Sequence, residues 1–256
     1  MKPSVLLAVG CSWVAGKSID TDPTLETFDR DHIEDPRFVG QHSFAGLLQQ
    51  RMGLDQLHML ARPGANNDEQ LKSLVSFLEA NYNNYSKIFV LCGITSVYRW
   101  EMYSSSAKAV VNCHPGKKID SEEVKYYFSN HWNKDYELEK LGTKIIMLDG
   151  YLKSLDIDHL FVNSFNSDLQ LTIDSFYSDD LLSLLCRKNK IKISNSSVPF
   201  LNLLKPKEQQ FNSPSVIALQ EQCWLDRATA HPTVKAHKLI ADELYDYIKE
   251  KNNERI

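Results

Sequence analysis

A serine stands directly after a short apolar run near the start of the chain. Residues 4–9 (SVLLAV) are rich in Val and Leu, which predicts a strand buried on both faces inside a parallel sheet. Gly10 ends the run and lets the chain turn sharply before Ser12. Because open α/β sheets bind ligands at the carboxyl ends of their strands, Ser12 is predicted to lie where a nucleophile could act.

Two familiar motifs are not matched around this serine. The G-x-S-x-G elbow of the α/β-hydrolases is absent. Gly16-Lys17-Ser18 resembles the end of a P-loop, but Cys11 stands where that loop needs its first glycine. The following residues 19–23 (IDTDP) favour the required helix poorly. Nucleotide binding through a P-loop is therefore the lesser alternative to chemistry by Ser12.

The rest of the chain alternates between apolar runs typical of strands and amphipathic stretches typical of helices. This alternation predicts an α/β fold with a central parallel sheet of about five strands and helices on both faces. Residues 17–42 are polar and predict a long loop, and residues 164–225 predict an insertion within a single domain spanning 1–256. Further strands are expected at 57–60, 87–92 and 159–163, and helices at 44–51, from 67 or 68, from 121, at 135–155, near 179–186 and within 231–247.

Composition and charge exclude several classes of protein. A net charge of −4, with Lys and Arg spread along the chain, gives no support for a nucleic-acid partner. No apolar run approaches the roughly 20 residues of a membrane span, and the N-terminal apolar run lacks a signal-peptide cleavage site. The five cysteines include no C-x-x-C pair, which argues against a disulfide framework or a zinc site. We expect a cytoplasmic protein with no cofactor, no metal and no membrane partner.

Four short blocks stand in an order that resembles the SGNH (GDSL-type) hydrolases. Gly10-Cys11-Ser12 follows the first predicted strand, Gly64 lies in a turn after the second, Gly93 follows the third, and His231-Pro232 precedes the final helix. The resemblance, to a divergent member of a bacterial or phage-borne type, implies a three-layer α/β/α flavodoxin-like fold. It also implies a serine esterase acting through an acyl-enzyme. Ser12 would attack the ester carbonyl, and His231 would remove its proton and later protonate the leaving alcohol.

The same resemblance implies an oxyanion hole made by the main-chain N–H of Ser12, by Gly64 and by an Asn side chain after the third strand. This chain has Thr95 at that Asn position, and a threonine hydroxyl can donate one hydrogen bond. Asn66 or Asn67 could supply the amide instead. The alternative for Asn67 is a helix cap.

The acid of the catalytic group also departs from the family. Its usual place, three residues before the histidine, is occupied by Ala228. Asp226 is separated from His231 by four residues. Two alternatives stay open: Asp226 orients the imidazole as the third member of a triad, or a backbone carbonyl orients it in a Ser–His dyad.

Residues 95–101 (TSVYRWE) resemble a variant of the third block. Arg99 could bind a carboxylate or sugar hydroxyls near Ser12, or pair with Glu101 to shape the loop. Trp13 and Trp100 could form a flat wall for a sugar ring or an acyl chain, or pack inside the protein. The expected substrate is a small acyl or acetyl ester of a small molecule or carbohydrate. The alternative from another class is a non-catalytic SGNH-like module that is structural or binds carbohydrate.

Overall fold

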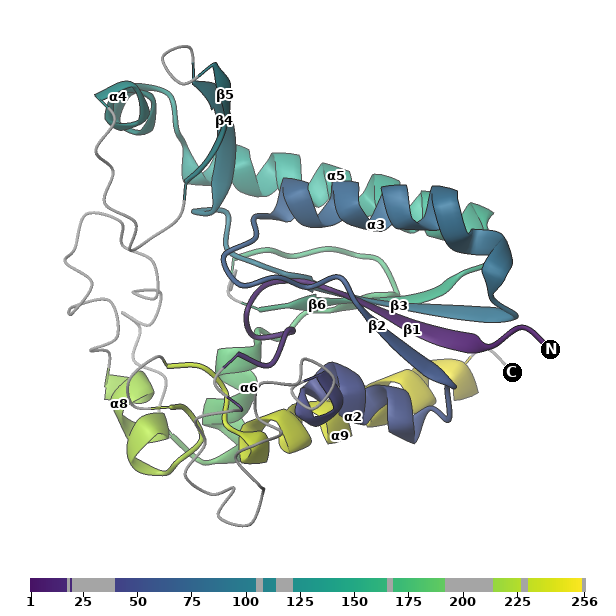
Figure 1. Ribbon diagram of the computed structural model, residues 1–256. Coiled ribbons are helices and arrows are strands. Elements are labelled where there is room, and N and C mark those ends of the chain that lie inside the picture. Colours follow the sequence, from purple (N-terminus) through teal and green to yellow (C-terminus); the bar gives the residue numbers. More distant parts are fainter. Residues whose placement is uncertain are drawn as a thin grey trace, which may run out of the picture.

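A parallel sheet forms the centre of the computed structural model, which describes residues 1–17, 19, 40–104, 108–113, 122–164, 168–191, 214–226 and 230–254 (Figure 1). Within these residues its strand order is β2-β1-β3-β6-β7. Counting only these strands, the order is 2-1-3-4-5, which is the flavodoxin-like order. The predicted fold class is therefore confirmed. The strands are β1 (Ser4–Val9), β2 (Gln56–Met59), β3 (Lys87–Ile94), β6 (Asp158–Asn163) and β7 (Phe176–Tyr177).

Helices cover both faces of the sheet and make it a three-layer structure (Figure 1). One face carries α3 (Asn67–Asn81) and α5 (Lys134–Ser154), and the other carries α2 (Phe44–Arg51) and α9 (Val234–Asn253). Alternate residues of β1 supply the two cores. Leu6 and Ala8 join the cluster on the α2 and α9 side, while Val5, Leu7 and Val9 join the cluster on the other side. Burial on both faces explains why the strand is a continuous apolar run.

Local signals placed both ends of α2 correctly and missed one end of β3 and of α3 by one or two residues. Helix α2 spans the predicted residues, and the Ser43 side chain caps it by accepting a hydrogen bond from the Gly46 N–H. Strand β3 runs two residues further than expected, so that Gly93 and Ile94 lie inside the strand instead of in a turn. Helix α3 is capped by Asn66, and the expectation of a cap at Asn67 or Asp68 was wrong by one residue.

A hairpin that we did not predict lies beyond the end of β3. Strands β4 (Trp100–Ser104) and β5 (Ala109–Cys113) pair antiparallel, and α4 (Glu122–Asn130) packs beside them through a small cluster that includes Val124. These elements stand over one end of the α3 and α5 layer (Figure 1). Residues 98–119 mix aromatic and polar side chains without a clean period of two, so the pattern did not reveal the strands.

The predicted insertion at 164–225 is described only in part. Its described residues form β7, α6 (Leu181–Lys188) and α8 (Pro214–Glu221). Strand β7 extends the central sheet next to β6, and α6 belongs to the same hydrophobic cluster as α9. Residues 192–213, Ser18 and most of the loop predicted for residues 17–42 lie outside the described residues. Among the helices that the structure describes, none offers the long apolar stretch that spanning a bilayer requires.

Candidate active site

Two glycines allow the Ser12 segment to lie directly against the ends of β1 and β3. Val14 packs so closely on Gly10 and Gly93 that a Cβ atom at either position would lie 2.3 Å from Val14 Cγ2. The Ala15 N–H donates to the Cys11 carbonyl at 3.0 Å, which winds the segment into a helical turn. This turn, residues 11–17, holds Ser12 at the carboxyl end of β1.

A short loop before α9 presents His231. The Asp226 N–H donates to the His231 carbonyl, and the Ala230 N–H donates to the Asp226 carbonyl, both at 2.8 Å. Leu225 and Pro232 form an antiparallel bridge beside them. The loop is therefore closed by main-chain hydrogen bonds on both sides of the histidine, which fix the place of the imidazole relative to α9.

The two segments bring their side chains together. Ser12 Oγ and His231 Nε2 are 2.8 Å apart, although the residues are separated by 219 positions in the chain. This is the distance of a good hydrogen bond and is within the reach required of a nucleophile and its general base. Ser12 is 4% exposed. The geometry allows the imidazole to take the hydroxyl proton as the oxygen attacks an electrophile.

Asp226 is tied to His231 through the main chain. Their backbone hydrogen bond keeps the aspartate next to the histidine despite the long spacing between them. A part for the Asp226 carboxylate in orienting the imidazole stays a prediction.

The turn that carries Gly64 is attached to the end of β1. The Ala65 N–H donates to the Arg62 carbonyl at 3.2 Å, and Gly64 has φ +80°, as expected at the third position of a type II turn with Pro63 before it. The Arg62 N–H donates to the Gly10 carbonyl at 3.0 Å. The predicted second block therefore lies beside the glycine that precedes Ser12.

Asn67 and Thr95, both predicted to serve the oxyanion hole, are bonded to each other. The Asn67 amide donates to the Thr95 carbonyl and accepts from the Thr95 N–H, each at 2.9 Å. The cap of α3 is instead Asn66, whose side chain accepts from the Glu69 N–H at 2.8 Å. Asn67 thus joins the start of α3 to the end of β3. No local pattern in the sequence indicated this link.

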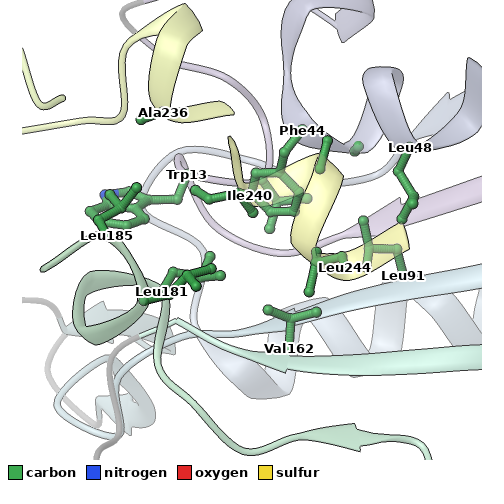
Figure 2. Close-up of a cluster of buried hydrophobic side chains, with 14 of the residues drawn as sticks. Trp13, Phe44, Leu48, Leu91, Val162, Leu181, Leu185, Ala236, Ile240 and Leu244 are labelled. Carbon is green, nitrogen blue, oxygen red and sulfur yellow. The ribbon is translucent and has the colours of Figure 1, made fainter. Parts of the chain in front are cut away.

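The residues predicted to contact substrate have different surroundings from those expected. Glu101 forms an ion pair with Lys72 and not with Arg99, so the expected Arg–Glu pair was wrong. Trp13 is 2% exposed and lies in the core with Leu181 and Leu185, where it cannot form an open wall (Figure 2).

Trp100 is also buried, at 7% exposed, and its ring lies 4.8 Å from that of Tyr127. Packing inside the protein is therefore the better interpretation for both tryptophans.

His237 is a buried residue of α9 that lies close to the site. It is fully buried, and its Nδ1 accepts the Phe44 N–H at 3.1 Å. Burial, with a smaller contribution from the nearby His231, lowers the pKa of His237 to about 3. The imidazole is therefore neutral at physiological pH and joins α9 to the start of α2.

A second grouping of Ser, His and Asp side chains occurs on α5, β6 and the segment before β7. His159 Nε2 lies 2.9 Å from Asp149 Oδ1, but the Ser175 hydroxyl donates to Asp149 and not to the histidine. Burial alone would raise the pKa of Asp149, but hydrogen bonds from Lys153, Ser175 and His159 hold it below its ordinary value. Without a contact between nucleophile and base, this group is structural. Among the described residues, no set of three or more His, Cys, Asp or Glu side chains is arranged to hold a metal ion.

Comparisons with known proteins found similarity at the level of structure alone. No protein-family model and no curated protein sequence matches the chain. Among solved structures, the psychrotrophic esterase EstA from Pseudoalteromonas sp. aligns over 97% of this chain and 98% of its own, with 13% identity and a TM-score of 0.42. A member of the lipolytic G-D-S-L family from Veillonella parvula aligns over 95% and 97%, with 11% identity and a TM-score of 0.33.

Phospholipase A1 from Streptomyces albidoflavus aligns over 98% of this chain and 100% of its own, with 10% identity and a TM-score of 0.32. Identities this low and superpositions this loose say nothing about chemistry. The function of this chain must therefore be inferred from the residues of the site.

Proposed function

We propose that this chain is a serine ester hydrolase that acts through an acyl-enzyme. The observation that carries the proposal is the 2.8 Å contact between Ser12 Oγ and His231 Nε2 at the carboxyl end of the sheet. A serine hydroxyl is a weak nucleophile until an adjacent base removes its proton, and this contact supplies the base.

The reaction has two halves. Ser12 Oγ attacks the ester carbonyl while its proton passes to His231 Nε2, and the tetrahedral intermediate collapses as the same nitrogen protonates the leaving alcohol. Water then attacks the acyl-enzyme with His231 again as base, which releases the acid and restores the serine. Asp226 is proposed to orient the imidazole and stabilise its protonated form.

The oxyanion of each tetrahedral intermediate needs donors already in place. We assign this part to the main-chain N–H groups of Ser12 and Gly64 and to the Thr95 hydroxyl. The Asn67 amide holds both main-chain polar groups of Thr95. Asn67 is therefore a positioning residue here, which fixes Thr95 at the end of β3.

The deep position of Ser12 favours a small acyl group. Ser12 is only 4% exposed as a residue, and acetyl or another short acyl ester, on a small molecule or a carbohydrate, is the substrate we propose for it.

The test is turnover of p-nitrophenyl acetate by the full chain and by two variants. Ser12→Ala and His231→Gln are each expected to lower kcat/KM by at least about 10³-fold, because the two groups act as a unit. Circular dichroism and thermal unfolding would show whether the variants fold. A fluorophosphonate probe is expected to label Ser12 in the wild type and to fail with Ser12→Ala. Turnover that survives in a folded Ser12→Ala variant would reject the proposal, and a wild type that neither turns over nor labels would favour the non-catalytic module.

A further inference from the structure

Arg99 has an unusual environment for an arginine. Its Nε and Nη1 atoms are buried, and neither has a hydrogen-bond acceptor among the described residues. The carboxylate of Glu101, two residues away in the chain, is taken by Lys72. A guanidinium group carries five donors and keeps its charge, so buried guanidinium nitrogens without acceptors are costly unless something else binds them.

Arg99 is one of the residues that line a small cavity between the starts of α3 and α5. The cavity has a volume of ≈ 30 Å³, about twice the space that one water molecule needs. Trp100 also lines it, and the indole N–H of Trp100 is buried without an acceptor in the described part of the chain. Two residues that line the cavity therefore carry buried donors that lack acceptors in the described part of the chain.

The other charges around the cavity cancel. Glu137 pairs with Lys140 at 3.0 Å, and Asp68 pairs with Lys144. Arg99 is then the one lining charge that has no ion-pair partner among the described residues, which leaves a net charge of +1. A site with one positive charge and a small volume matches a monovalent carboxylate group better than a phosphate, which is larger and carries up to two negative charges.

We propose that this cavity binds a carboxylate group of the substrate through Arg99 and the Trp100 N–H. The link to the reaction centre is Asn67, which lines the cavity and whose amide holds the main chain of Thr95. Only the Asn67 side chain would then separate a carboxylate bound in the cavity from Thr95, one of the predicted oxyanion donors. Resting on the proposed function, the inference narrows the substrate to short esters that also carry a free carboxylate.

The kinetic test compares two esters of the same shape. One is 4-nitrophenyl hydrogen succinate, which carries a free carboxylate, and the other is its neutral methyl ester. The wild type is expected to prefer the acidic ester by at least about tenfold in kcat/KM, as a charged hydrogen bond warrants. Arg99→Gln is expected to bring this ratio close to one. Arg187→Gln, which removes the same charge from an exposed residue of α6, serves as the matched control and should keep the wild-type ratio.

The binding test does not require turnover. Monomethyl succinate is titrated calorimetrically into Ser12→Ala protein at low ionic strength, with and without Arg99→Gln or Trp100→Phe. We expect Arg99→Gln to weaken binding at least tenfold, and Trp100→Phe, which keeps the ring but loses the N–H, to weaken it severalfold. Inorganic phosphate serves as the competing anion and should bind more weakly.

The outcomes separate the two proposals. Binding that depends on Arg99 in a protein that hydrolyses neither ester would support the carboxylate site and reject the esterase. Hydrolysis of both esters at equal rates, with binding unaffected by Arg99→Gln, would reject the carboxylate site and leave the esterase standing. Tighter binding of phosphate than of monomethyl succinate would also overturn the carboxylate assignment.

Discussion

The contact of Val14 with Gly93 gives the most direct test of how Ser12, the proposed nucleophile, is held. An alanine Cβ at position 93 would lie 2.3 Å from Val14 Cγ2, and every other neighbouring atom is at 3.6 Å or beyond. Only one methyl group therefore stands in the way. We expect Gly93→Ala to destabilise the protein by about 1–3 kcal/mol through overpacking, because Val14 is fully buried and cannot swing away.

A second substitution should relieve this clash. Val14→Ala alone removes two buried methyl groups and is expected to cost about 2 kcal/mol. In the double variant the obstructing methyl group is gone. The double variant should therefore lose about as much free energy of unfolding as Val14→Ala loses alone. The coupling energy from the double-mutant cycle is then about 1–3 kcal/mol, measured by urea unfolding.

The same pair should affect catalysis, because Val14 belongs to the turn that carries Ser12. In Gly93→Ala the turn can relieve the clash only by shifting, which moves Ser12 Oγ from its place beside His231 Nε2. A shift of about 1 Å would lower kcat/KM for p-nitrophenyl acetate by about 10²-fold, and Val14→Ala should restore part of it.

Gly10→Ala is the matched control for this rescue. There the new Cβ would also lie 2.8 Å from Val14 Cβ, which Val14→Ala retains, and φ at Gly10 is +156°. Val14→Ala should therefore fail to rescue it. Stability losses of Gly93→Ala and Val14→Ala that add within about 0.5 kcal/mol would refute the reasoning, since the two sites would then be independent.

Two further predictions concern groups near His231. If Asp226 orients the imidazole, Asp226→Asn should lower kcat by as much as about 10⁴-fold with little change in thermal stability. A decrease in kcat of less than tenfold in a steady-state assay would mean that the main chain orients the imidazole instead. His237 has a pKa of about 3 when folded against 6.5 ordinarily, so it has no effect on stability above pH 6.5. As the pH falls from 6.5 towards 3, the unfolded chain takes up a proton that the folded chain refuses, and the free energy of unfolding should fall by up to about 1.4 kcal/mol per pH unit. His237→Gln should show a shallower fall in urea unfolding across this range, and equal slopes for the two proteins would contradict the prediction.

Local signals in the sequence were enough for the architecture. Strand β1 is apolar throughout because helices cover both faces of the sheet, and the run at residues 4–9 therefore marked it directly. Helix α2 was bounded by a serine cap and a following glycine, which act within a few residues. The position of Ser12 at the end of β1 followed from the same local pattern.

Where local patterns were weak, the prediction failed. The β4 and β5 hairpin has no regular alternation, and its strands pair with each other outside the central sheet. Gly93 was expected in a turn, but it lies in β3, where Val14 from another segment occupies the space that a side chain would fill. Neither fact can be read from the neighbours of these residues in the chain.

The sequence by itself determined most of the strands and helices of the three layers. The order of its short blocks, which resembles that of the SGNH hydrolases, singled out Ser12 and His231. Tertiary structure alone decided which side chains meet: Ser12 with His231, Asn67 with Thr95, and Glu101 with Lys72 in place of Arg99. The physical reason is that periodicity and capping act over a few residues. Contacts between distant segments depend instead on how the helices pack on the sheet, which places residues 219 positions apart within hydrogen-bond distance.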